Sequence, residues 1–414
     1  MMPLVVVYDQ GAVSPTDVLA GVGRPLVVVL AATEHAQRVR PLFAETWPVY
    51  DLADPGLVEH LRGHAPSGVQ TFSEPMLGPT SALAGALGLP FHDAATVTLL
   101  TSKKAQRQRL RDAGVDKTAS VPLDDPALWD EVVAQVGLPV VVKPVVGVSS
   151  RNTVLVHDLE EGRALVAAIL RDEGAVVVEE YLRGVEVADP WGDYVSVESV
   201  AQDGRVRHLA VTGKLRLAPP FRECGQFWPA RLPAAEIAEI EQLATRAITA
   251  LGVQSGILHT EVKLTGAGPR VIEVNGRAGG YIPDLARHAA GIDLVGVGAD
   301  LALGRRVELP PVAPDRVHLQ FTTPAPVERA VVTGVCRAAD VAGVPGLVRY
   351  TSLVRRGATV GGFGTQDLDL VSVVADDHGS LAAAVAELVD AITYRFEIDG
   401  QAVTRSAREL IYPV

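Results

Sequence analysis

Short apolar runs alternate with helix-type patterns over residues 1–95. Leu4–Tyr8 and Leu26–Leu30 are rich in valine, as the buried strands of parallel sheets are. Pro79–Leu87 has the pattern of a helix. This order of strands and helices predicts a small, doubly wound α/β domain. Its Gly21-Val-Gly23 segment lacks the third glycine of a dinucleotide-binding fingerprint.

The patterns beyond residue 95 predict three further regions. The periodicity of residues 96–118 predicts one helix that Gly114 closes. Pro310-Pro311 indicates a boundary, after which the pattern becomes β-rich. We therefore predict an α/β (α+β) chain with further domains over residues 96–190, 191–309 and 310–414. Strands are expected at Val140–Lys143, Val176–Glu179, Tyr194–Ala201 and Val206–Gly213, and helices at Leu159–Asp172 and Ala234–Leu251.

An alternating stretch within residues 257–281 predicts a β-hairpin with one polar face. If the two strands fold about Ala267, Glu261 lies opposite Glu273 and His259 lies opposite Asn275. Side chains of a strand alternate between its faces with a period of two. One face therefore takes His259, Glu261, Lys263, Glu273, Asn275 and Arg277, and the core face takes Leu258, Val262, Leu264, Ile272 and Val274.

Two facing carboxylates need a cation, because opposed Cβ atoms lie roughly 5 Å apart and like charges there repel. Glu261, Glu273 and Asn275 offer hard oxygen ligands, which suit Mg²⁺ or Mn²⁺ rather than Zn²⁺. Mg²⁺ usually completes its shell with water and substrate phosphates. The alternative is a solvated face relieved by Lys263 and Arg277. The aligned asparagine and arginine, followed by two glycines, favour a metal–nucleotide site.

Three lysines stand at the ends of predicted elements, where they could reach a triphosphate: Lys103, Lys143 and Lys214. Each alone is most simply a surface lysine. The segment after Lys143 contains Ser149 and Ser150, whose hydroxyls could hold anionic oxygens together with backbone N–H groups. It lacks the Walker pattern, so an ordinary turn is the alternative.

Residues 179–186, Glu-Glu-Tyr-Leu-Arg-Gly-Val-Glu, follow a predicted strand and turn at Gly184. Extended backbone there could hydrogen-bond adenine, and a carboxylate could accept from ribose hydroxyls. An edge strand with solvated acids is the alternative.

Composition restricts the class of protein. A net charge of −12 and no long Lys/Arg run disfavour a nucleic-acid partner. Two cysteines make no disulfide framework, and reduced thiols in the cytoplasm are the simplest interpretation. The first residues lack a signal-peptide pattern, and the longest apolar runs are too short to span a bilayer. We therefore expect a cytoplasmic protein with no membrane partner.

Taken together and in this order, these segments resemble the ATP-grasp superfamily, and within it the carboxylate–amine ligases of the L-amino-acid ligase type. The resemblance covers residues 70 to 310. It implies an ATP-grasp fold: an N-terminal α/β domain, a central two-lobed ATP-binding region and a β-rich C-terminal domain. It also implies ATP and two Mg²⁺ ions, with Mn²⁺ as a substitute.

The resemblance assigns roles to individual residues. Lys103, Lys143 and Lys214 match lysines that hold ATP phosphates. Glu179, Glu180 and Leu182 match the adenine-reading hinge, and Glu186 matches the ribose-binding acid. Glu261, Glu273 and Asn275 match the ligands of the two ions, with Glu273 bridging. On the substrate side, Arg277 is similar to the arginine facing the transferred phosphoryl group, Glu223 resembles an acid that binds a substrate amino group, and His259 lies where such ligases place a residue beside the amino acids.

This sequence departs from the family pattern in three places. Ser102 replaces the usual acid or asparagine before Lys103, and Asn152 stands where a glycine is usual. The segment Val187–Asp193 looks like an insertion after Glu186, which affects the alignment near Tyr194–Glu198. None of these departures removes a metal ligand.

The activity that the resemblance implies is the joining of an amino acid carboxylate to an amine, which is expected to be a second amino acid; the partners are thus small-molecule amino acid substrates. ATP would activate the carboxylate as an acyl phosphate and leave as ADP. Three alternatives remain open: loading of an amino acid onto a carrier protein, a biotin-carboxylase-like reaction, and a silent nucleotide-binding protein. Similar enzymes are commonly homodimers, although no feature of the sequence shows one.

Overall fold

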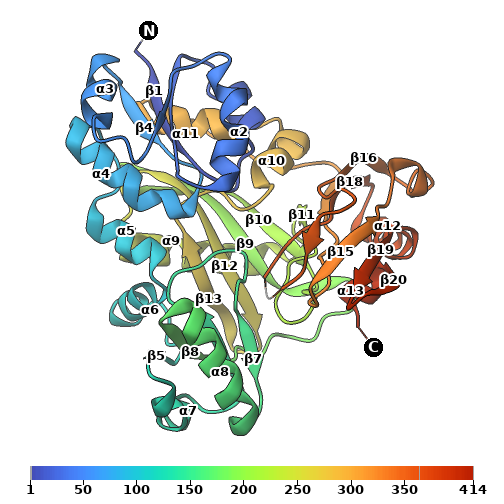
Figure 1. The fold of residues 1–414 in the computed structure, drawn as a ribbon. Coiled ribbons are helices and arrows are strands. Elements are labelled where there is room, and N and C mark those ends of the chain that lie inside the picture. Colours follow the sequence, from blue (N-terminus) through green and yellow to red (C-terminus); the bar gives the residue numbers. More distant parts are fainter. Residues whose placement is uncertain (1, 363, 414) are drawn as a thin grey trace.

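The computed structural model describes residues 2–362 and 364–413. Figure 1 shows three lobes around a set of long central strands: the blue N-terminal domain above, a green lobe below and the orange-red C-terminal part to the right. Among the described residues no helix is both long and apolar enough to cross a bilayer.

The N-terminal domain is a parallel α/β sheet, as its sequence predicts. Both β1 and β2 are rich in valine, and every residue of the two strands is buried. Helix α11 (Leu294–Ala302) returns from the central region and packs its Val295 and Ala299 into this core. The strand order is β3-β2-β1-β4, with β1 (Leu4–Tyr8), β2 (Leu26–Leu30), β3 (Val49–Asp51) and β4 (Gly68–Gln70), joined by α1 (Pro15–Gly21), α2 (Glu34–Ala44), α3 (Leu57–Gly63), η1 (Glu74–Met76) and α4 (Leu77–Leu87).

The single helix predicted for residues 96–118 is wrong. Two helices occupy this range, α5 (Ala94–Thr101) and α6 (Lys103–Asp112). The chain leaves the helical conformation at Ser102 (φ −103°, ψ 108°), whose hydroxyl accepts from the N–H of Ala105 and caps α6. Periodicity continues across such a break, but the cap makes Lys103 the first residue of a new helix.

The green lobe is an antiparallel sheet with helices on it. Trp129 and Val166 lie in its core, which the strands supply mainly with valines. The loop at 145–153 joins two of these strands on the side facing the centre (Figure 1). The strand order is β5-β8-β6-β7, with β5 (Ser120–Leu123), β6 (Val140–Pro144), β7 (Val154–Val156) and β8 (Val176–Glu180), and the helices are η2 (Pro126–Leu128), α7 (Trp129–Val136) and α8 (Leu159–Glu173).

The central sheet is antiparallel and continues into the C-terminal part of the chain. Its order is β13-β12-β9-β10-β11-β14-β18-β16. Strands from beyond residue 310 thus pair directly with β11, so the division at residues 95, 190 and 309 stays a prediction. The strands are β9 (Trp191–Gln202), β10 (Arg205–Leu215), β11 (Gly225–Trp228), β12 (Gly256–Thr265), β13 (Gly268–Asn275), β14 (Val317–Phe321), β16 (Leu347–Ser352) and β18 (Asp369–Ala375).

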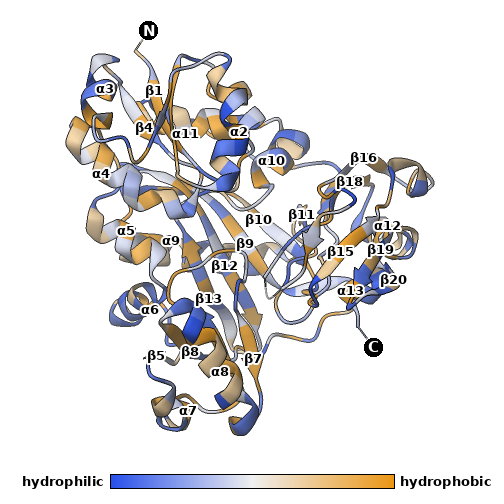
Figure 2. Cartoon of the chain, viewed as in Figure 1, coloured by the Kyte–Doolittle hydropathy of each residue, from blue (hydrophilic) through white to orange (hydrophobic). Residues whose placement is uncertain are grey.

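A smaller C-terminal sheet shares a hydrophobic core with one end of the central sheet. Helix α12 (His378–Ala391) packs against β14, β18 and β20 and so contacts strands of both sheets, and Figure 2 shows hydrophobic colour on β15. The smaller sheet has the order β17-β15-β19-β20, with β15 (Ala330–Gly334), β17 (Thr359–Val360), β19 (Thr393–Ile398) and β20 (Gln401–Ser406); the remaining helices are α9 (Ala234–Ala250), α10 (Ile282–Ala290), η3 (Ala338–Asp340), α12 (His378–Ala391) and α13 (Ala407–Ile411).

The hairpin of β12 and β13 has the predicted pairs at the polar end. Glu261 lies opposite Glu273, and His259 lies opposite Asn275. The route to this register differs from the prediction, because Thr265 pairs with Gly268 across a two-residue turn. Between the Glu261–Glu273 and Val262–Val271 pairs, β13 has one extra residue, Ile272. This bulge shifts the pairing by one residue and so gives the predicted register at the polar end.

This bulge corrects the predicted core face. Val271 is fully buried, whereas Ile272, which we expected in the core, is only partly buried. At the bulge, the backbone carbonyls receive their hydrogen bonds from helix α6. The guanidinium of Arg107 donates to the carbonyls of Val271 (2.8 Å) and Ile272 (2.9 Å). The side-chain amide of Gln106 donates to the carbonyl of Val274 and accepts from the N–H of Val274, each at 2.8 Å. A mainly hydrophilic helix (Figure 2) thus fixes β13 through buried polar contacts.

Candidate active site

The first contact of the site joins α6 to the hairpin. The ammonium of Lys103 lies 3.0 Å from a carboxylate oxygen of Glu273 and donates to the carbonyl of Gly147 at 2.9 Å. Burial alone would raise the pKa of Glu273, but the charges of Lys103 and Lys143 outweigh it and lower that pKa. Ser102 makes this contact possible, because the cap places Lys103 at the start of its helix.

The opposed acid behaves differently. Burial, followed by the charge of Glu273, raises the pKa of Glu261. On the same strand, the Nε2 of His259 is 3.7 Å from the Glu261 carboxylate. The pair therefore consists of one compensated and one under-compensated carboxylate, an environment that favours an added cation.

Asn275 and Arg277 meet an acid that the sequence analysis missed. Glu74, in η1, is buried and lies 3.0 Å from the guanidinium of Arg277. The amide of Asn275 is satisfied when its nitrogen donates to Glu74 (2.7 Å) and to Glu273 (3.1 Å). Burial raises the pKa of Glu74 despite Arg277. The only sequence signal was a carboxylate soon after a parallel strand, and no spacing connects it to the hairpin.

Lys143 approaches the same site from the green lobe. Its ammonium lies 2.8 Å from Glu179, which also accepts from Arg107 at 3.0 and 3.2 Å. Burial would raise the pKa of Glu179, but Arg107 and Lys143 outweigh it and lower the pKa to about 2. The side chain of Glu179 is therefore engaged inside the protein, where it positions Lys143. Arg107 was missed because its pattern is that of an exposed helix.

The rest of the predicted hinge follows β8. Glu180 pairs with Arg270 at 3.1 Å, and the N–H of Tyr181 donates to the carbonyl of Pro139 at 3.2 Å. Leu182 is half-buried and Glu186 is exposed in the loop that leads to β9. Nucleotide contacts of these residues stay predictions.

The loop after β6 has an unusual backbone. Ser149 (φ 57°), Ser150 (φ 52°) and Asn152 (φ 50°) all adopt left-handed conformations without being glycine. The amide of Asn152 donates to Glu173 at 2.6 Å, so this departure from the family pattern has its own support. The carbonyl of Ser149 accepts from the N–H of Thr365 at 2.7 Å. The loop thus lies between Lys103 on one side and the C-terminal part on the other.

On the substrate side, Lys214 and Glu223 form an ion pair at 2.9 Å. Lys214 is almost fully buried, whereas the side chain of Glu223 is 41% exposed and accepts from the hydroxyl of Tyr194 at 3.4 Å. Burial would raise the pKa of Glu223, but Lys214 outweighs it and lowers that pKa. Gln226 accepts from Lys214 at 3.2 Å. Glu223 therefore keeps one side open to solvent while Lys214 fixes it.

His259 is oriented by a second acid that the sequence analysis missed. Its Nδ1 lies 2.9 Å from Glu198, which is buried on β9. The hydroxyls of Ser196 (2.8 Å) and Thr212 (3.0 Å) also donate to Glu198. An acid in the middle of a valine-rich strand was the signal that could have found it.

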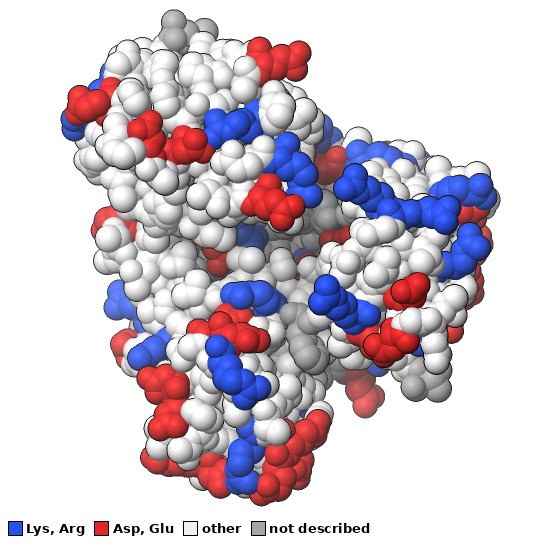
Figure 3. Space-filling model, viewed as in Figure 1, with Lys and Arg blue, Asp and Glu red and all other residues white. Residues whose placement is uncertain are grey.

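Direct contacts thus bring Lys103, Glu273, Asn275 and Arg277 together, with His259 and Glu261 beside them. Lys143 belongs to the same group, because its positive charge lowers the pKa of Glu273. Figure 3 shows a recess between the three lobes with acidic and basic atoms on its floor. The predicted hinge residues and the loop serines lie on the green lobe at the edge of this region.

The donor set fits a hard divalent cation only in part. Within the described ranges no group of three His, Cys, Asp or Glu side chains is arranged to hold a metal by itself. Two glutamates and an asparagine suit Mg²⁺, which is commonly held by one or two carboxylates and completed by phosphate oxygens. The raised pKa of Glu261 also indicates a carboxylate that lacks a cation.

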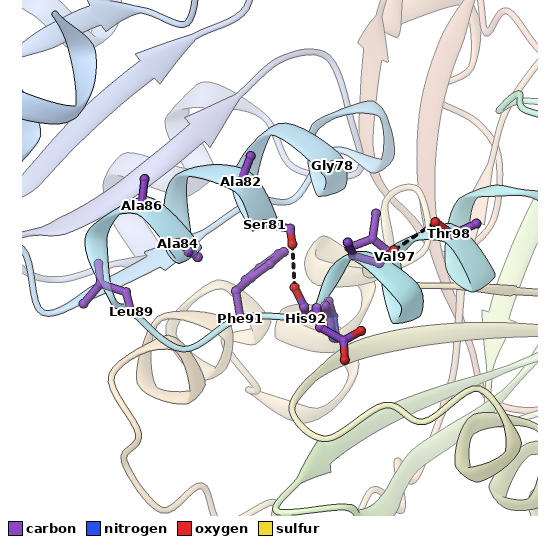
Figure 4. A pocket seen from close by; sticks show the side chains of 13 residues that line it. Gly78, Ser81, Ala82, Ala84, Ala86, Leu89, Phe91, His92, Val97 and Thr98 are labelled. Atoms are coloured by element: carbon purple, nitrogen blue, oxygen red, sulfur yellow. Dashed lines mark hydrogen bonds between the residues drawn. The ribbon is translucent and has the colours of Figure 1, made fainter.

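A separate hollow of about 600 Å³ lies between α4 and α5. Figure 4 shows it lined by small side chains such as Ala82 and Ala86, with Phe91 and His92 along the connecting segment. None of the predicted site residues lines it.

The architecture of the chain is the ATP-grasp fold. The family model described as "ATP-grasp domain" matches residues 136–283, which include Lys143, residues 179–186 and the hairpin of β12 and β13. The fold class predicted from the sequence is confirmed.

Known proteins similar to this chain include a synthase and ligases. It is 30% identical to carnosine synthase 1 of Mus musculus over 268 residues, which covers 59% of this chain and 31% of that protein. It is 25% identical to alanine–anticapsin ligase of Bacillus subtilis (strain 168) over 263 residues, covering 58% of this chain and 55% of that protein. The chain spans from a third to about half of the length of these relatives.

A solved structure resembles almost the whole chain. The L-amino acid ligase from Bacillus licheniformis superposes with a TM-score of 0.75 at 21% identity, covering 97% of this chain and 99% of that one. At this identity the likeness establishes the fold.

Proposed function

We propose that this chain is an ATP-dependent ligase that joins the carboxylate of an amino acid to an amine, releasing ADP and phosphate. The observation that carries the proposal is the facing pair of Glu261 and Glu273, with Lys103 on one acid and Arg277 beside them. The names of the similar proteins, carnosine synthase, alanine–anticapsin ligase and L-amino acid ligase, support it.

The chemistry explains why so many charges converge. A carboxylate is a poor acyl donor at neutral pH, and phosphorylation by ATP would convert it into an acyl phosphate that an amine can attack. Such a transfer depends on positioning and on neutralising negative charge. Lys103 and Lys143 would bind phosphate oxygens, and Arg277, held by Glu74, would face the transferred group. Lys214 would bind phosphate or orient Glu223.

Glu261, Glu273 and Asn275 would hold two Mg²⁺ ions, with Mn²⁺ as a substitute. Bound there, the ions would supply positive charge to the triphosphate. The chain's own contribution is to keep these side chains in place: α6 fixes β13 through Gln106 and Arg107, and Glu198 fixes His259.

The recess would also receive the amino acid substrates. Glu223 presents an exposed carboxylate suited to an ammonium group, and His259 lies close to Glu261. The loop at 147–152 would exclude water from the acyl phosphate, since Lys103 and Thr365 hold it on two sides. The hinge formed by Glu180 and Leu182 would carry adenine, and Glu186 would bind ribose.

We further propose that the reaction takes place in the cytoplasm with free amino acids as substrates. A carrier protein as acceptor, and a homodimer, are compatible with the same ATP site. Acceptor assays and the mass of the purified protein in solution distinguish these cases.

The test is a screen of phosphate release over pairs of amino acids, with nucleotide analysis and mass detection of products. We expect ADP, phosphate and a product whose mass is the sum of two amino acids less one water. AMP and pyrophosphate would reject the acyl-phosphate mechanism. Turnover only with bicarbonate and biotin would favour a carboxylase, and ATP binding without acceptor-dependent hydrolysis would favour a silent protein.

A further inference from the structure

Two aspartates near the start of β18 differ in the hydrogen bonds that their carboxylate oxygens accept. Asp369 is fully buried, and both of its oxygens have donors: the N–H of Thr323 at 3.0 Å and the hydroxyl of Tyr394 at 2.8 Å. Asp367 accepts from the hydroxyl of Tyr281 at 2.9 Å through Oδ2. Its Oδ1 is buried and has no hydrogen-bond partner among the described residues. A buried carboxylate oxygen without a partner is costly and therefore indicates a ligand.

The sheet places Asp367 at the same edge as Glu223. Strand β14 lies between β11 and β18 and is antiparallel to both, so the starts of β11 and β18 meet beside its end at Phe321. Glu223 precedes β11, and Asp367 precedes β18 and forms a bridge with Pro324. Adjacent strands are about 4.8 Å apart, which puts the two backbones roughly 10 Å apart. The two acids therefore stand on one border of the recess.

Tyr281 connects Asp367 to the reaction site. It follows Arg277 by four residues and adopts a left-handed conformation (φ 60°, ψ −4°), which is uncommon for a bulky side chain. Gln226 fixes the preceding turn by donating to the carbonyl of Gly280 at 2.7 Å. Strained backbone persists only where surrounding contacts impose it, and it is concentrated at binding sites. Here it directs the Tyr281 hydroxyl to Asp367.

The charges around Asp367 indicate the kind of ligand. The charged groups acting on it are Glu223 and Asp369, both acids, and the hydroxyls of Tyr281 and Thr322 lower its pKa; no cation of the described chain is among these groups. Burial, followed by these acids, raises the pKa of Asp367 to about 7. Glu223, by contrast, already has Lys214. A carboxylate with a free oxygen and no cation of its own suits a cationic hydrogen-bond donor.

We propose that Asp367, held by Tyr281, binds the ammonium group of one amino acid substrate. The proposal rests on the proposed function, because that reaction brings amino acids to this recess. It adds the C-terminal part of the chain to the substrate site and gives one substrate an anchor distinct from Glu223.

The test compares an amino acid with its desamino analogue, for example alanine with propionate, in the full-length protein. For Asp367→Asn we expect the KM of one amino acid to rise by about 10- to 100-fold, the range of a lost charge-assisted hydrogen bond. The KM for ATP should change less than about twofold, and the preference for the amino acid over its analogue should disappear. Tyr281→Phe should shift the same KM in the same direction by a smaller factor.

The matched control is Asp369→Asn, which removes a buried charge two residues away. It should leave the preference for the amino acid intact. Because no cation compensates Asp367, Asp367→Asn should melt no lower than the parent, so a failure to fold is not expected. With the parent protein, the affinity for that amino acid should fall as pH drops through about 7, where Asp367 gains its proton, and the variant should lack this step.

The outcomes separate the two proposals. If the parent forms ADP with an amino acid pair but Asp367→Asn changes both amino acid KM values less than threefold, the ammonium site is wrong and the ligase function stands. If no pair supports turnover, the proposed function fails. Calorimetric titration of amino acids into the parent and Asp367→Asn proteins then decides the ammonium site alone: equal affinities would overturn it.

Discussion

Glu179 offers a quantitative test of how the green lobe is held together. Its carboxylate is buried between Arg107 and Lys143, at 3.0 and 2.8 Å. The pKa falls from 4.5 to about 2, and one pKa unit corresponds to about 1.4 kcal/mol, so the ionised carboxylate contributes a net of about 3 kcal/mol to the free energy of unfolding at neutral pH, after the cost of its burial. Measured losses from breaking one side of a buried ion pair are about 3–5 kcal/mol.

Glu179→Gln should therefore lower the free energy of unfolding by about 3 kcal/mol at pH 7, measured by urea titration. The sign with pH follows from a depressed pKa: the contribution is complete above about 4.5 and is lost as pH falls toward about 2. The difference between parent and variant should shrink over this window. Glu180→Gln is the matched control, because its pair with Arg270 is 35% exposed on the acid side and should contribute less than about 1 kcal/mol.

Two results would refute this reasoning. A loss below about 1 kcal/mol at pH 7 would mean that Arg107 and Lys143 find other partners or water. A loss that does not change between pH 7 and pH 3 would mean that the carboxylate charge is not its source. In either case Glu179 would be available to a nucleotide, as the sequence analysis first suggested.

Two further predictions concern the hairpin and the packing of the green lobe. Glu273→Ala should lower kcat by ~10³-fold or more in the ADP assay, because the partner of Lys103 at 3.0 Å and a proposed bridging ligand are both lost; near-normal activity would contradict the bridging role. Gly162→Ala should lower stability by ~1–3 kcal/mol in thermal unfolding, since a Cβ there would overlap the Trp129 ring. Gly85→Ala, also helical but with no described atom within 4 Å, should be neutral or stabilising, and equal losses at both positions would rule out overpacking.

Much of the site could be found from the sequence because it depends on local periodicity. The Glu261–Glu273 pair follows from two alternating strands and a short turn, and the structure confirms it. Lys143 and Lys214 could be placed at strand ends for the same reason. The register was right although the predicted turn was not, because the bulge at Ile272 compensates for the shorter loop.

The missed residues share a physical cause. Glu74, Glu198 and Arg107 act across distances of more than sixty residues in sequence, with partners on other elements. Each is a charge whose effect comes from burial beside an opposite charge. A sequence shows the charge but not the partner that lies across from it.

The sequence by itself determined many of the strands and helices and the polar face of the hairpin, since side-chain periodicity is a property of neighbouring residues; the break at Ser102 between α5 and α6 was not among them. Only the tertiary structure decided that Glu179 holds Lys143, that Arg107 supports the bulge and that Asp367 stands beside Tyr281. These contacts depend on which elements pack together, and packing is set by the whole core at once. The chemistry of each residue is therefore local, whereas its electrostatic environment belongs to the fold.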